Sequence, residues 1–104
     1  MTTITTDRRS AAEALDRLIA VARSDTGQSR RVANFLLAWW CGEEHGHFPI
    51  ADMFGLDRAI AADIAAIIGF LGQQPCAVYA DEFGRREEIR DLIRLWRPAR
   101  TEAA

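Results

Sequence analysis

Large apolar side chains recur at helical spacing in four segments of this 104-residue chain, and no segment alternates convincingly in the way of a strand. The segments begin near residues 10, 29, 58 and 85 and end near residues 24, 41, 71 and 97. Glycine or proline follows each one closely, as is typical of helix ends. A short helical turn is expected over residues 50–54, and residues 76–84 are expected to be irregular or a short turn at most. The pattern predicts an all-α fold, a compact bundle of four main helices plus a short helical turn.

Several of the expected helix boundaries carry capping signals. Ser10 and Glu13 have the spacing of a capping box, so Ser10 is expected to cap the first helix. Asp57 precedes the third helix and is predicted to be its N-cap. Gly72 is predicted to end that helix as a C′ residue, with Pro75 shortly beyond it.

The second segment is apolar along nearly its whole length, since Asn34 is its only polar residue after Arg31. Burial of such side chains stabilises a fold by roughly 1.5–3 kcal/mol each. We therefore expect this helix to be central and to pack against the third and fourth helices. The third helix has only Asp63 as a charge between residues 59 and 71, so it is expected to be buried on nearly all sides. The predicted core consists of Phe35, Leu36, Trp39, Trp40, Ile64, Ile68, Ile89, Leu92 and Trp96.

Composition and charge limit the class of protein. Residues 7–98 are expected to form a single helical domain, with flexible segments at 1–6 and 99–104. Apolar residues make up 49% of the chain, and the net charge of −2 argues against a general attraction to nucleic acid or anionic membranes. The longest apolar stretch is too short to span a bilayer. The polar first residues and two cysteines without zinc or redox spacing lead us to expect a cytoplasmic protein with free thiols.

The loop expected over residues 42–49 concentrates side chains of the types that bind metals. Cys41, His45 and His47 are weak candidates for a metal site, since thiolate and imidazole both suit zinc. Their spacing matches no established zinc pattern, however, and a solvated loop with a positive φ near Gly46 is the favoured interpretation. We therefore expect no metal or other cofactor.

A helix-turn-helix is a second hypothesis, for residues 50–68. A small residue, a turn glycine and two apolar residues fall where that motif requires them, at Ala51, Gly55, Leu56 and Ile64. The leading side chains of the recognition helix would include Asp57 and Asp63, however, and these carboxylates would repel phosphates. A simple helix corner is the favoured interpretation.

An arginine row on the last helix is the third candidate. At about 100° per residue, Arg86, Arg90, Arg94 and Arg97 share one face beside the apolar stripe. Such a row suits an acidic protein surface or a phosphate backbone. The alternative is a solvated face on which neighbouring carboxylates pair with the arginines.

Self-association is a fourth hypothesis. The second and third helices are nearly all apolar, so either both are buried within one chain or a second copy covers part of one. Small residues at Ala61, Ala65 and Gly69 would allow a close two-fold helix contact in a homodimer.

Several motifs resemble those of a known family. They are Val32–Trp40 (VANFLLAWW), the Gly/His loop with Phe48, the turn over residues 52–57, and Leu95–Pro98 (LWRP). Over about residues 30–98 the chain resembles an uncharacterised family of short proteobacterial proteins, often encoded in integrative or plasmid-borne elements. That family has Asn and Ala at the positions of Cys41 and Gly42, and Trp at the position of Phe54, which weighs against an essential role for Cys41. The resemblance implies a genomic setting in which proteins of this size are often accessory regulators or inhibitors that act by binding.

Signatures of catalysis are absent from the sequence. No serine lies in G-x-S-x-G, no G-x-G-x-x-G or H-E-x-x-H occurs, and the lack of lysine excludes Schiff bases and P-loops. We therefore expect a non-enzymatic protein-interaction module or accessory regulator. The alternatives are nucleic-acid binding through the arginine row and a metal-dependent enzyme centred on His45 and His47.

Overall fold

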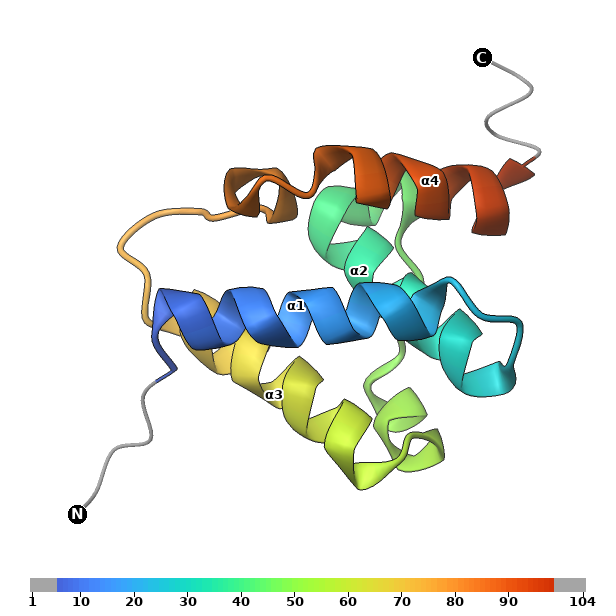
Figure 1. Cartoon of the computed structure of the whole chain (residues 1–104), viewed down its shortest axis with the longest axis horizontal. Coiled ribbons are helices and arrows are strands. Elements are labelled where there is room, and N and C mark those ends of the chain that lie inside the picture. The colour runs from blue at the N-terminus through green and yellow to red at the C-terminus, as the bar shows by residue number, and fades with distance from the viewer. Residues whose placement is uncertain (1–5, 99–104) are drawn as a thin grey trace.

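The computed structural model describes residues 6–98 and contains four α-helices, two 3-10 helices and no strand within that range (Figure 1). The elements are α1 (Arg8–Ala22), α2 (Gly27–His45), η1 (Ile50–Gly55), α3 (Arg58–Gly72), η2 (Ala80–Phe83) and α4 (Arg86–Trp96). The predicted all-α fold of four main helices and a short turn is confirmed, and η2 is a second short turn. The ends expected to be flexible, 1–6 and 99–104, lie outside the described residues apart from Thr6.

The capping predictions need correction at two helix ends, and at a third the predicted residue is right but its side chain makes no capping bond. Asp7, not Ser10, caps α1, because its carboxylate accepts a hydrogen bond from the Ser10 backbone N–H at 2.7 Å. An anionic cap also interacts favourably with the positive end of the helix dipole. Asp57 is the N-cap residue of α3, as predicted, but its carboxylate accepts a hydrogen bond from Gln28 and not from a backbone N–H of the helix. Gly72 lies inside α3, which continues to an ordinary right-handed cap at Gln73.

Helix α1 is the element that connects the other helices. It packs against α3 and α2, and it also contacts α4, whereas α2 packs mainly against α1 and α4 (Figure 1). The expectation that α2 packs against α4 is confirmed, but the main neighbour of α3 is α1 and not α2 as expected. Helical periodicity identifies which face of α3 is apolar but does not identify the helix that covers it.

The hydrophobic core joins buried side chains from all four α-helices. From the predicted set, Phe35, Leu36, Ile64, Ile89 and Leu92 are buried. Ile68 is 47% exposed, so its assignment to the core is wrong; the buried face of α3 is instead formed by Ile64, Ile67 and Phe70. This face is narrow because α1 covers α3 from one side only, and α3 is not buried on nearly all sides as expected.

The three tryptophans are only partly buried, because each indole packs one side against the core. Trp39 donates its indole N–H to the carbonyl oxygen of Val78 at 2.9 Å. Trp96 donates in the same way to Ala22 at 2.9 Å and so joins the end of α4 to the end of α1. In both residues the hydrogen bond satisfies the indole N–H, while the ring packs against apolar side chains.

Helix α2 extends beyond its expected end but is broken at Cys41, whose φ of −155° and ψ of 84° are not helical. The segment after the break forms one more turn that ends at His45. Gly46 has a negative φ, so the positive φ expected there is wrong; within residues 6–98 only Gly84 has a positive φ.

No helix in the described range is long and apolar enough to cross a membrane.

Candidate protein-binding surface

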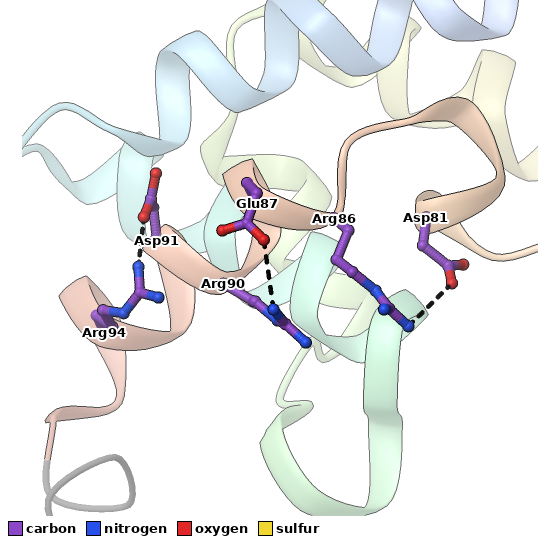
Figure 2. Close-up of polar contacts among 6 residues, drawn as sticks. All are labelled: Asp81, Arg86, Glu87, Arg90, Asp91 and Arg94. Atoms are coloured by element: carbon purple, nitrogen blue, oxygen red, sulfur yellow. Dashed lines mark hydrogen bonds and ion pairs between the residues drawn. The ribbon is translucent and has the colours of Figure 1, made fainter.

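Three of the four arginines in the predicted row are exposed on the surface of α4. Ile89 and Leu92 turn the opposite side of the helix into the core. This leaves Arg86, Arg90 and Arg94 along one outer side, with side chains that are 58%, 49% and 57% exposed (Figure 2). We call these three residues the arginine face.

Each arginine of this face pairs with a nearby carboxylate, as Figure 2 shows. Arg90 lies 3.3 Å from Glu87, and Arg94 lies 2.5 Å from Asp91, both one turn away on α4. Arg86 reaches across to Asp81 on η2 at 3.8 Å. Exposed ion pairs of this kind contribute only about 0–1 kcal/mol each, so the guanidinium groups can exchange these carboxylates for others.

Arg97, the fourth predicted member, departs from the row. Helix α4 ends at Trp96, and the Arg97 guanidinium turns toward α2. It donates hydrogen bonds to the side-chain oxygen of Asn34 at 2.7 Å and to the backbone oxygen of His45 at 3.0 Å. These hydrogen bonds hold the end of α4 against the broken end of α2.

Two further arginine–aspartate pairs join helices through two hydrogen bonds each, and sequence reasoning missed both. Arg85 donates two hydrogen bonds to Asp16 on α1, at 2.6 and 3.0 Å. Those hydrogen bonds lower the pKa of Asp16 and raise the pKa of Arg85. Arg17 makes the same two-pronged contact with Asp63 on α3, at 3.0 and 2.9 Å, so the one charge between residues 59 and 71 has a structural partner.

The residues proposed as metal ligands are not arranged as a metal site. The Cys41 thiol and the His45 imidazole each lie 3.8 Å from the Glu44 carboxylate, and His47 is exposed. Across residues 6–98, no three His, Cys, Asp or Glu side chains are placed to hold a metal ion. The buried Nδ1 atom of His45 also makes no hydrogen bond within this range.

The segment considered as a helix-turn-helix has a different geometry from that motif. Its first helix is the single 3-10 element η1, whose residues are exposed or half-buried. The carboxylate of Asp57, just before α3, accepts a hydrogen bond from Gln28, and that of Asp63, within α3, accepts one from Arg17. Arg17 neutralises Asp63, but the contact of Asp57 with the neutral Gln28 leaves its negative charge in place, which would repel a DNA backbone.

The outer face of α3, proposed for a dimer, is not covered by any segment within residues 6–98. Ala65 and Gly69 are exposed, Ala61 is half-buried, and Ile68 adds a large apolar side chain beside them. A methyl group added at Gly69 would meet no atom within 4 Å.

A groove of about 550 Å³ opens where the end of α2 faces the segment around η2. It combines aromatic rings with carboxylates and is lined by Ala38, Trp39, Trp40, Cys41, Gly42, Glu43, Tyr79 and Asp81. Sequence reasoning missed this groove, because Trp39 and Trp40 were assigned to the core and Tyr79 lies some forty residues further along the chain. We call it the aromatic groove.

Comparison with curated proteins and with solved structures finds no match to this chain. The resemblance described above implied an uncharacterised family, and one such family is found. The sequence profile of DUF7673, described as a family of unknown function, matches residues 12–97, from within α1 to the residue after α4. Because this match covers most of the chain, the protein belongs to DUF7673, a family of unknown function.

Proposed function

We propose that this protein is a non-enzymatic interaction module whose arginine face binds an acidic surface of a partner protein. The observation that supports this proposal is the display of Arg86, Arg90 and Arg94 on one outer side of α4, each about half exposed. Arginine is enriched among the residues that dominate protein interfaces, because its planar fork binds a carboxylate through two hydrogen bonds.

Arg90 and Arg94 can readily leave the carboxylates that they now contact for carboxylates of a partner protein. Glu87 and Asp91 are themselves more than half exposed, so little is lost when a guanidinium leaves them for a carboxylate in a drier interface. By contrast, Arg85 and Arg17 are held by two hydrogen bonds each and are not available in the same way. The arginine face is therefore better suited to a new partner than these two paired arginines are.

Nucleic-acid binding is the weaker candidate for the same face. The carboxylates of Glu87 and Asp91 lie directly beside the arginines and would approach phosphates together with them. Binding to nucleic acid by this surface would fall steeply with added salt. Fluorescence anisotropy with labelled duplex DNA and single-stranded RNA at low salt separates the two functions, since we expect no binding to either.

The wider setting of the protein is part of the proposal. A cytoplasmic accessory regulator or inhibitor encoded by a mobile element would act by binding, without a catalytic site. The support for this setting is the resemblance of the VANFLLAWW and LWRP motifs to those of proteins from mobile elements.

The test is affinity capture from a native lysate with three forms of the protein. They are the wild type, Arg90→Glu/Arg94→Glu, and a control with the same change of charge, Arg30→Glu/Arg58→Glu. Arg30 and Arg58 are exposed at helix starts, where glutamate is tolerated. We expect quantitative mass spectrometry to find a protein that the wild type and the control recover and the α4 variant does not; equal recovery by all three would exclude the arginine face.

We propose as a second candidate that two copies associate through the outer face of α3. The exposure of Ile68, Ala65 and Gly69 on one side of this helix supports it, since their apolar surface has no cover within residues 6–98. Small side chains would allow the two α3 helices to approach closely.

A further inference from the structure

The aromatic groove has rings on two sides whose positions are set by the fold. On one side, the Trp39 indole is fixed by its hydrogen bond to Val78 and by edge contact with Phe83, at 6.1 Å between ring centres. Trp40 follows it at the end of the regular part of α2. On the other side, Tyr79 precedes η2 and is 48% exposed, so its ring is accessible.

The two charged side chains that line the groove, Glu43 and Asp81, are both negative. The Glu43 carboxylate makes no hydrogen bond or ion pair with any part of the described chain. Asp81 has one ion pair, to Arg86, and at 3.8 Å this contact is long. The regular part of α2 also ends here, at the Cys41 break, and the C-terminal end of a helix carries partial negative charge.

Aromatic faces, carboxylates and a helix C-terminus all attract cations. The face of an aromatic ring is electron-rich, and tryptophan binds an ammonium or guanidinium group best among the aromatic residues. An anion would be repelled by Glu43 and Asp81, and a purely apolar group would remove water from both carboxylates without replacing it. The chemistry of the groove therefore selects a positively charged group with an apolar stem.

We propose that the aromatic groove binds the cationic side chain of an arginine or lysine on a partner protein. The groove adjoins the arginine face through the contact between Asp81 and Arg86, so one partner can reach both. That this cationic side chain belongs to a protein, and not to a small molecule, rests on the proposed function. The partner then presents a basic residue to the groove and acidic residues to Arg90 and Arg94.

The experiment uses the tryptophan side chains of the full chain as reporters. The peptide acetyl-Gly-Arg-Gly-amide is titrated into ¹⁵N-labelled protein, and the three indole N–H signals are followed by NMR. We expect the signals of Trp39 and Trp40 to shift in a saturable way, while Trp96, whose indole is bonded to Ala22, stays unchanged. A peptide with neutral citrulline in place of arginine should bind at least about fivefold more weakly, since it lacks the positive charge.

Variants identify the groups responsible. Glu43→Gln should raise the Kd of the arginine peptide by about three- to tenfold, whereas Glu13→Gln, an exposed control on α1, should leave it unchanged. Tyr79→Leu should weaken binding and Tyr79→Phe should retain it, because the ring face is kept. Absence of shifts, equal shifts with citrulline, or wild-type affinity in Glu43→Gln would each overturn the proposal.

The outcome is independent of the arginine face, because the peptide carries no acidic residue. Arg90→Glu/Arg94→Glu should bind the arginine peptide at least as tightly as the wild type does. Failure of peptide binding in the wild type would overturn the groove site and leave the arginine face standing. Failure of the capture experiment with intact peptide binding would overturn the arginine face alone.

Discussion

At the scale of single residues, the two glycines at the broken end of α2 differ in what surrounds them. A methyl group added at Gly46 would lie 2.7 Å from the backbone oxygen of Gly42 and 2.9 Å from the Cα atom of Ala38. A methyl group added at Gly42 would meet nothing within 4 Å. Gly46 is thus required by a close approach of backbone to backbone, which a side chain would prevent.

We expect Gly46→Ala to lower the free energy of unfolding by about 1–3 kcal/mol, because the neighbouring backbone must move. Gly42→Ala should leave it unchanged or slightly raised, since alanine favours helical backbone. Urea unfolding followed by circular dichroism measures both. Equal destabilisation by the two substitutions would contradict this account of the break.

The pairing of Asp16 with Arg85 predicts a dependence of stability on pH. Hydrogen bonds from Arg85 lower the pKa of Asp16, so the folded protein takes up this proton less readily than the unfolded chain. The stabilisation is therefore present above the ordinary aspartate pKa of about 3.9 and is lost as the pH falls through the lowered value in the fold.

Accordingly, Asp16→Asn should be less stable than the wild type at neutral pH, and this difference should shrink as the pH falls from about 5 toward about 2. Asp25→Asn serves as the control, because Asp25 is exposed and outside every ion pair found within residues 6–98. Thermal unfolding at a series of pH values gives the comparison. A difference for Asp16→Asn that stays constant with pH would contradict the role of the pair.

At the scale of the helices, the sequence predicts the elements well but their ends and neighbours less well. Apolar periodicity locates all four α-helices, since the spacing of buried side chains is a local property. The start of α1 is predicted wrongly, because Asp7 and Ser10 are both good caps and only the fold decides between them. Likewise, the apolar surface of α3 does not reveal that α1 covers it, or that Ile68 is left outside.

The candidate sites likewise divide into parts that lie within one helix, which the sequence predicts, and parts that depend on the fold, which it does not. Three of the four arginines of the row lie together because they share one helix, whereas Arg97 falls beyond the helix end and turns to Asn34. The aromatic groove was not predictable from periodicity, because it depends on Tyr79 and Asp81 lying opposite the end of α2.

At the scale of the whole molecule, the outer face of α3 predicts the state of association. If two copies meet there, light scattering at increasing concentration should show the mass of a dimer. Ala65→Glu should then give the mass of a monomer, because it places a charge in an apolar contact. The control Ala20→Glu lies on the exposed side of α1 and should leave the dimer intact. A monomer at every concentration of the wild type would contradict the α3 contact.

The central claim, that the arginine face holds an acidic partner, is tested most directly with the protein recovered in the capture experiment. Isothermal titration measures its Kd for the wild type, for Arg90→Glu/Arg94→Glu and for the control Arg30→Glu/Arg58→Glu. We predict that the α4 variant raises the Kd at least about tenfold, because two attractive contacts become repulsive, while the control stays within about twofold. Values within about twofold of the wild type for both variants would contradict the claim.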